Sequence, residues 1–145
     1  MRKIMIVDDN YLSAEGIEKN IDWEVLNAEI VHICYNGTSA IDAMKKEHVD
    51  LIISDIEMPD LDGISMSRQA LDINPMVKII LISAYDKFEY ARRALLLGAL
   101  DYIRKTSGLR ISDPEVKNAF ALMEREQKNL QLLKQSRPLL IENFP

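Results

Sequence analysis

Side chains that can do chemistry stand at the C-terminal ends of four short apolar runs. These are Ile4–Val7 followed by Asp8 and Asp9, Leu51–Ser54 followed by Asp55, Ile79–Ile82 followed by Ser83, and Asp101–Arg104 followed by Lys105. In a parallel α/β sheet all these ends lie along one edge, which is where such sheets bind ligands. We therefore expect three carboxylates, a hydroxyl and an ammonium group to converge on one site.

The three aspartates predict a metal site, because crowded carboxylates repel one another unless a cation lies between them. Ligand sets made only of oxygen suit a hard cation, and Mg²⁺ with retained waters is the usual occupant. Adding Lys105 balances the charges of such a site. It can then accept a dianionic phosphoryl group, with a carboxylate as the covalent nucleophile. Ser83 would donate to a phosphoryl oxygen.

Each of these residues also has a structural explanation when taken alone. An aspartate that follows a strand is commonly the N-cap of the next helix, so Asp8 or Asp9 by itself would be interpreted as a cap. Ser83 or Lys105 by itself would be an ordinary polar residue. The combination, in order along one predicted edge, is what favours a site.

Short apolar runs alternate with amphipathic runs, which predicts a parallel sheet with helices on both faces. The expected strands are Lys3–Val7, Glu29–Cys34, Asp50–Ser54, Val77–Ile82 and Leu100–Arg104, and the expected helices are Tyr11–Asn20, Thr38–Glu47, Gly63–Ile73 and Lys87–Leu97. Three turn signals support these limits. Asn36-Gly37 opens the second helix, Asn74-Pro75 ends the third, and Gly98 can take the left-handed conformation that ends the fourth.

The last segment predicts one long helix. Ser112–Glu115 combines a serine cap, a proline and a glutamate in the order typical of a helix start. A helix over Asp113–Ser136, which would end before Pro138, would be about 36 Å long. A heptad-like 4-3-4-3 spacing, which Lys134 breaks, runs through this helix. Its positions are Val116, Phe120, Met123, Gln127 and Leu130. Two interpretations stay open: the first three pack on the sheet and the rest is a solvated tail, or the helix pairs with a copy of itself. The apolar residues after Pro138 suggest that the chain continues in a longer protein.

The composition sets further limits. The chain has 145 residues and a net charge of -5, which favours one domain without a nucleic-acid-binding surface of its own. No apolar run approaches the roughly 18 residues of a membrane span, and the N-terminus does not resemble a signal peptide. The single cysteine, Cys34, predicts a buried, inert thiol and fits a reducing cytoplasm.

Four motifs carry a specific resemblance. They are Asp8-Asp9-Asn10, the segment Ser54–Gly63, Ile82-Ser83-Ala84-Tyr85 and Asp101–Lys105. In this order and spacing they resemble the receiver domain of bacterial two-component response regulators. The resemblance covers residues 1–111 and leaves residues 112–145 as a last helix that extends into a linker toward an output domain. Ile21-Asp22-Trp23, Asp86–Ala91 and Arg137–Phe144 resemble the subgroup whose output domain is an AraC-type DNA-binding domain.

This resemblance implies a fold and a set of roles. The fold would be flavodoxin-like, a doubly wound five-stranded parallel sheet of order 2-1-3-4-5. Asp55 would accept a phosphoryl group from a histidine kinase. Asp9 would bind Mg²⁺ directly and Asp8 largely through water, while Glu57 would contribute its backbone carbonyl.

The resemblance also implies a response to phosphorylation. Ser83 would contact the phosphoryl group, Lys105 would pair with it, and Tyr102 would be an aromatic switch that turns inward as Ser83 moves. The readout would be a shift of the face formed by the fourth helix, fifth strand and last helix. Self-association through that face or through the C-terminal helix would then control transcription.

One residue departs from the family pattern. The lysine is usually followed by a proline with a cis bond, but here Thr106 follows Lys105. A cis bond before a residue other than proline costs about 3–4 kcal/mol. We therefore expect a trans bond and a rerouted loop after Lys105, with a weaker contact between Lys105 and Asp55.

Two other functions fit parts of the pattern. A Mg²⁺-dependent aspartyl-phosphate phosphatase would use Asp55 as nucleophile and the acid two residues later, Glu57, but the sequence has no insertion that could form a substrate cap. A flavodoxin-like cofactor binder would need a Gly/Ser/Thr-rich phosphate loop where Asp8 and Asp9 stand. His32 and His48 are expected to take no part in the site, and Trp23 is expected to pack at the exit of the first helix rather than to bind a ligand.

Overall fold

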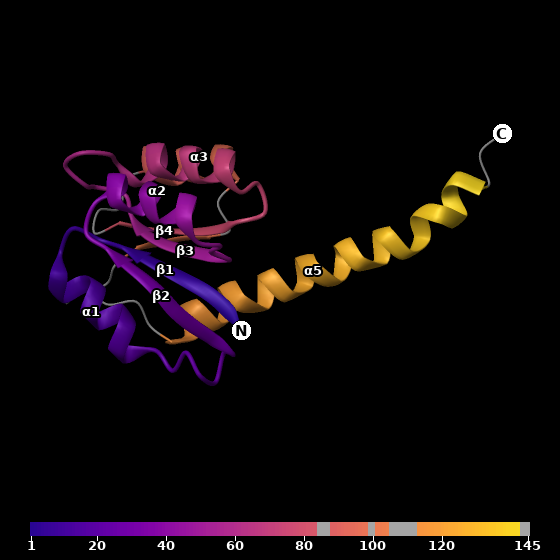
Figure 1. Ribbon diagram of the computed structural model, residues 1–145, viewed down its shortest axis with the longest axis horizontal. Helices are drawn as coiled ribbons and strands as arrows, with labels where there is room; N and C mark the ends of the chain where they lie inside the picture. Colours follow the sequence, from indigo (N-terminus) through magenta and orange to yellow (C-terminus); the bar gives the residue numbers. More distant parts are fainter. Residues whose placement is uncertain (84–87, 99–100, 105–112, 143–145) are drawn as a thin grey trace.

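The computed structural model describes residues 1–83, 88–98, 101–104 and 113–142 of the chain (Figure 1). The strands are β1 (Arg2–Val7), β2 (Ala28–Cys34), β3 (Leu51–Asp55), β4 (Lys78–Ser83) and β5 (Asp101–Arg104), and the helices are α1 (Tyr11–Asn20), α2 (Gly37–Lys46), α3 (Gly63–Ile73), α4 (Phe88–Leu97) and α5 (Asp113–Glu142). The bounds of α1 and α3 are those predicted from the sequence, and the other strands and helices up to β5 differ from prediction by one residue at one or both ends.

All five strands are parallel and lie in the order β2-β1-β3-β4-β5. This confirms the predicted doubly wound, flavodoxin-like sheet. The chain order switches direction between β1 and β3, which are hydrogen-bonded neighbours at the centre of the sheet. A crevice that can receive a ligand forms at such a switch point.

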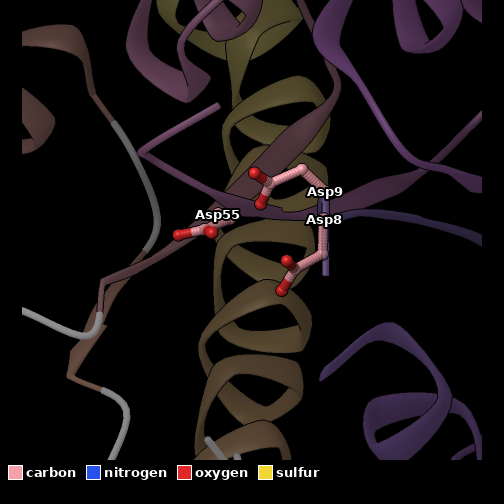
Figure 2. Close-up of side chains that lie close together, drawn as sticks. All are labelled: Asp8, Asp9 and Asp55. Carbon is pink, nitrogen blue, oxygen red and sulfur yellow. The ribbon is translucent and has the colours of Figure 1, made fainter. Parts of the chain in front are cut away.

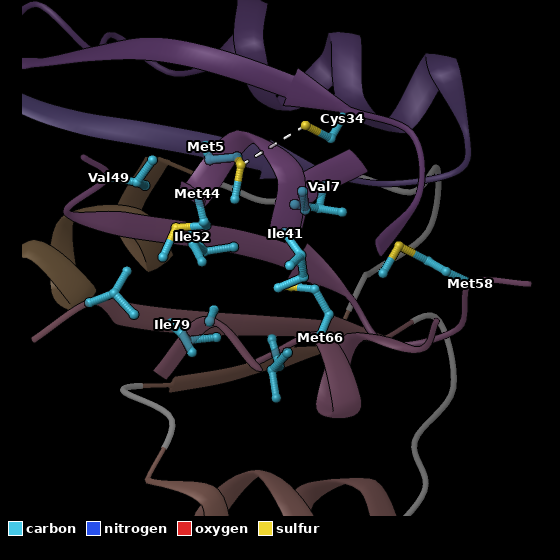
Figure 3. Packing of buried hydrophobic residues seen from close by; sticks show 14 of the residues in the cluster. Met5, Val7, Cys34, Ile41, Met44, Val49, Ile52, Met58, Met66 and Ile79 are labelled. Carbon is cyan, nitrogen blue, oxygen red and sulfur yellow. Dashed lines mark hydrogen bonds between the residues drawn. The ribbon is translucent and has the colours of Figure 1, made fainter. Parts of the chain in front are cut away.

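Successive residues of the central strands point to opposite faces of the sheet, as the two-residue period of a strand requires. On one face Ile4, Ile6 and Ile53 pack with residues of α1 and α5. On the other face Met5 and Ile52 pack with residues of α2 and α3, as Figure 3 shows. Because both faces are covered, β1, β3 and β4 have continuous apolar runs at their centres rather than an alternating pattern.

Side-chain caps set the starts of three helices. Asn10 Oδ1 accepts from the Ser13 N–H to cap α1, Asn36 caps α2 in the same way, and Asp62 caps α3. The predicted turn signals are confirmed, since Asn74 is the C-cap of α3 and Gly98 follows α4 with a φ of 87°.

Helix α5 docks on the sheet only near its start. Phe120 and Met123 are buried with Trp23, whose ring centroid lies 6.4 Å from that of Phe120. The predicted packing role of Trp23 is therefore confirmed. Contacts of α5 with Arg2 and Lys78 continue as far as Gln127, and past them the helix projects from the body of the domain (Figure 1). It also continues through Pro138 to Glu142, six residues past the predicted end, because good helix formers stand on both sides of the proline and a proline removes only one backbone donor.

Candidate functional site

The carboxylates of Asp8, Asp9 and Asp55 come together at the C-terminal edge of the sheet (Figure 2). One oxygen from each lies within 4.8 Å of the others. Asp8 is buried, Asp55 is half-buried and Asp9 is exposed. Among the described residues, no other group of three acidic, histidine or cysteine side chains comes together in this way.

The register between two strands creates this cluster. In the parallel pair of β1 and β3, Val7 lies opposite Ser54. The next residues of the two chains are Asp8 and Asp55, so both carboxylates emerge side by side at the switch point. Asp9 follows directly and brings the third carboxylate to the same place.

Asp8 and Asp9 are not helix caps in this structure. The cap of α1 is Asn10, and Asp8 Oδ1 accepts the Asn10 N–H at 2.9 Å instead. This bond fixes the Asp8 carboxylate beside the N-cap of α1. The capping interpretation that each aspartate invites alone is therefore wrong, and Asp9 keeps an exposed carboxylate at the cluster.

The loop between β3 and α3 is held against Asp55 by a close backbone approach. The Gly63 N–H donates to the Ile56 carbonyl at 2.7 Å, and the Ile56 N–H donates to the Ile82 carbonyl of β4 at 3.0 Å. A Cβ atom at Gly63 would lie 2.1 Å from the Asp55 carbonyl oxygen. Only glycine fits there, so this position determines how closely α3 approaches the residue that carries the central carboxylate.

A cleft of about 570 Å³ opens beside the cluster. Its described lining combines acidic, apolar and basic residues: Asp9, Ile56, Glu57, Met58, Pro59, Asp62, Ile64 and Arg93. Asp9 belongs to both the cluster and the cleft. Sequence reasoning did not identify Asp62 or Arg93, because a cap residue and an exposed arginine on a helix carry no signal of their own.

The structure describes only some of the other predicted site residues. Ser83 ends β4, fully buried, one position beyond the Asp55–Ile82 pair, and Glu57 lines the cleft. Tyr102 lies in β5 opposite Leu81, but its side chain is outside the described part of the structure. Lys105 and Thr106, and with them the expected trans bond, lie outside the described residues.

The two histidines and the cysteine thiol are not part of the carboxylate cluster. His32 Nε2 is 2.7 Å from a Glu47 oxygen, and His48 Nε2 is 2.7 Å from an Asp50 oxygen. Cys34 is buried, its Sγ lies 4.0 Å from Met5 Sδ (Figure 3), and burial raises the pKa of its thiol. The prediction of a buried thiol is confirmed.

No helix in the described part of the chain is both long enough and apolar enough to span a membrane.

A model of the response regulator receiver domain family matches residues 4–111. The uncharacterized transcriptional regulatory protein YesN of Bacillus subtilis (strain 168) is 30% identical over 105 residues, which are 72% of this chain and 28% of YesN. The transcriptional regulatory protein DegU of Brevibacillus brevis is 31% identical over 103 residues, which are 71% of this chain and 43% of DegU. The chain thus spans less than half the length of these relatives.

Solved structures show the same relationship. The receiver domain of AraT, a response regulator from Geobacillus stearothermophilus, has a TM-score of 0.78 and 29% identity, covering 90% of this chain and 98% of that one. A two-component transcriptional regulator AraC from Clostridium phytofermentans has a TM-score of 0.72 and 27% identity, with coverage of 89% and 99%. The sequence match, the sheet order and the clustered aspartates agree, and the chain belongs to the response regulator receiver domain family of two-component signalling proteins.

Proposed function

We propose that this domain accepts a phosphoryl group on Asp55 from the phosphohistidine of a sensor kinase. The phosphorylated state then changes self-association and, through an output domain outside this sequence, the transcription of target genes. The observation that carries the proposal is the position of Asp55. It is a half-buried carboxylate at the end of a central strand, within 4.8 Å of two further carboxylates.

The donor set fits a hard divalent cation. Three carboxylates supply only oxygen ligands, and the exposure of Asp9 leaves room for retained waters, which Mg²⁺ requires. Asp9 would bind the ion directly, Asp8 largely through water, and Glu57 through its backbone carbonyl. Bound Mg²⁺ would offset the negative charge of the carboxylates and of an incoming phosphoryl group.

The surroundings of the three aspartates assign different roles to them. The Asn10 N–H holds one oxygen of buried Asp8, so this carboxylate is fixed as a ligand. Asp55 stands at the end of a strand that is hydrogen-bonded to a neighbour on each side, which fixes the position of the carboxylate that would attack phosphorus. Ser83, one register position further on the adjacent strand, would donate its hydroxyl to a phosphoryl oxygen. Lys105 would pair with the same group.

The signal would pass from β4 to β5. Ser83 lies opposite Arg104, and Leu81 lies opposite Tyr102 on the paired strands. A shift of Ser83 toward the phosphoryl group would give the Tyr102 ring room to turn inward, which changes the face formed by α4, β5 and α5. Because both states preserve the fold, this is a population shift between two packings.

The family relationship favours signalling over phosphatase activity. Glu57 does stand two residues after Asp55, as a second acid would in such a phosphatase, but no insertion in the sequence could cover a substrate. The proposed chemistry is therefore limited to accepting the phosphoryl group and releasing it slowly. Two-component partners of this kind meet in the cytoplasm, which also suits the free thiol of Cys34.

The test is incubation with acetyl phosphate and Mg²⁺, followed by intact-mass measurement and an assay for released phosphate. A receiver gains one phosphoryl group per chain and loses it slowly, and Asp55→Asn gains none. Rapid multiple turnover would support the phosphatase instead. Labelling of Asp55→Asn at the wild-type rate would overturn the assignment of the acceptor.

A further inference from the structure

Arg93 contributes the positive charge to the described lining of the cleft beside Asp9. The other charged residues of that lining are Asp9, Glu57 and Asp62. The arginine comes from α4, whereas the acids come from the ends of β1 and β3 and from the loop before α3. The described lining of the cleft therefore carries three acidic side chains and one basic side chain.

Arg93 shares its ion-pair partner with the neighbouring arginine. Its Nε lies 3.5 Å from Glu89 one turn earlier, but the same carboxylate is also 3.6 Å from Arg92. One glutamate thus serves two arginines, and a net positive charge remains on this part of α4. Across the cleft, Asp62 uses both carboxylate oxygens to accept from the N–H and hydroxyl of Ser65 at the start of α3.

The size of the cleft matters because it exceeds what a phosphoryl group alone would fill. A space of about 570 Å³ is within the range of small-molecule sites, roughly 300–1,000 Å³. A donor whose phosphoryl group approaches Asp55 can therefore extend into the space that Arg93 lines. An anionic donor must also pass the carboxylates at this edge, which repel it. A basic side chain in the lining of the cleft raises the local concentration of the donor.

We propose that Arg93 is a positioning residue for anionic phosphoryl donors, drawing the donor into the cleft so that its phosphorus faces Asp55. The inference rests on the proposed function and names the part of the chain that selects the donor. In the step it assists, an Asp55 oxygen attacks the phosphorus of an acyl phosphate and forms a new P–O bond. The bond to the acyl oxygen breaks, and the carboxylate leaves with the electron pair, so no further reactant is needed.

Three variants test this role. Arg93→Gln removes the charge, Arg93→Lys keeps it, and Arg92→Gln is a matched control on the same turn. Arg92 and Arg93 are similarly exposed, at 60% and 53%, and both contact Glu89, but Arg92 is not among the described residues that line the cleft. Phosphorylation rates are measured by intact mass at limiting acetyl phosphate and, separately, at limiting phosphoramidate, which carries less negative charge at neutral pH.

We expect Arg93→Gln to lower the rate with acetyl phosphate by about threefold to tenfold, the range for one partly screened charge. The loss should shrink at high salt and be smaller with phosphoramidate. Arg93→Lys should keep most of the rate, and Arg92→Gln should match the wild type. Thermal unfolding of all variants checks that they fold alike.

The inference is overturned if Arg93→Gln and Arg92→Gln are both phosphorylated at the wild-type rate with both donors, or if both variants lose the same share of that rate. Asp55→Asn in the same experiment separates this failure from a failure of the proposed function. If Asp55→Asn stays unlabelled while Arg93→Gln is unchanged, only the role of Arg93 is lost. If Asp55→Asn is labelled like the wild type, the acceptor is wrong and the role of Arg93 is lost with it.

Discussion

Asp8, Asp9 and Asp55 share one cluster, but the chain holds each of them differently. Asp8 is 1% exposed and accepts a backbone N–H, whereas Asp9 is exposed and belongs also to the cleft. Crowded carboxylates destabilise a fold through repulsion unless a cation offsets them. The cluster therefore lowers the stability of the metal-free domain and at the same time provides a site that a cation can occupy.

The repulsion among the three carboxylates predicts how the stability of Asp9→Asn differs from that of the wild type. Because the change removes one repelling charge, the metal-free variant should melt at the wild-type temperature or higher. The wild type should gain stability as Mg²⁺ is added, in proportion to the logarithm of the ion concentration above its Kd, and the variant should gain much less. Thermal unfolding over a Mg²⁺ titration measures both effects.

Asp42→Asn is the control for that experiment, since Asp42 is an exposed carboxylate on α2. It should respond to Mg²⁺ like the wild type. An Asp9→Asn variant that also keeps the full Mg²⁺ response would show that the ion binds elsewhere.

Gly63 gives a second test at the residue scale. A Cβ atom there would lie 2.1 Å from the Asp55 carbonyl oxygen, so Gly63→Ala must push α3 and the acceptor strand apart. We expect a loss of about 1–3 kcal/mol in the free energy of unfolding and slower labelling of Asp55. Urea unfolding and the acetyl phosphate assay check the two effects.

Gly16→Ala is the matched change on α1, where the nearest atom to a new Cβ, apart from the backbone of the helix itself, would be Asn20 Nδ2 at an ordinary 3.6 Å. It should stabilise the domain by about 0.5–1 kcal/mol, as alanine replaces glycine within a helix. Equal effects of the two substitutions would contradict the assigned role of Gly63.

Among the elements, α5 has two parts with different surroundings. Its first part packs Phe120 and Met123 against the sheet, and Arg2 lies over the Phe120 ring at 5.5 Å from the centroid. Ion pairs of Arg2 with Glu124 and of Lys78 with Glu126 continue the attachment for one more turn. Past this point the described side chains are exposed.

Phe120→Ala should therefore destabilise the domain by about 3–5 kcal/mol, the range for removing a buried aromatic side chain. Leu132→Ala, at a residue that is 61% exposed, should change stability by less than about 0.5 kcal/mol. Urea unfolding at a low protein concentration compares them. Similar losses in the two variants would show that the second part of α5 is packed like the first.

Most of the sheet could be predicted because four of the five strands end at or just before a polar residue, and each helix has its own cap or turn signal. The cluster could be predicted because parallel strands bring their C-terminal ends to one edge. The place of Arg93 could not, since it depends on how α4 packs against the rest of the domain. The clash at Gly63 depends equally on tertiary packing, and the path of α5 through Pro138 runs against the local rule that a proline ends a helix.

At the scale of the molecule, a compact sheet domain carries one projecting helix (Figure 1). Thirty helical residues extend about 45 Å, and the described side chains beyond Gln127 are exposed. An isolated helix of that size is marginal in water, so pairing with a second copy would stabilise it. The same helix would carry the signal toward an output domain.

Sedimentation velocity with Mg²⁺, with and without beryllofluoride, tests self-association. We expect the phosphoryl mimic to shift the chain from monomer toward dimer. If the projecting part of α5 forms the interface, Leu130→Glu should weaken the dimer, whereas Gln131→Glu adds the same charge on another side of the helix and should not. A dimer that survives Leu130→Glu would assign the interface to the face of α4, β5 and α5, and an unchanged wild-type monomer would contradict the dimer switch.

The central claim is that Asp55 carries the phosphoryl group, and borohydride trapping tests it most directly. After incubation with acetyl phosphate, reduction converts an aspartyl phosphate to homoserine, which peptide mass spectrometry can locate. The account predicts homoserine at position 55 alone, in a yield that depends on Mg²⁺ and falls when Asp9 is replaced by asparagine. Homoserine at position 8 or 9, or a yield at position 55 that chelation of Mg²⁺ leaves unchanged, would contradict it.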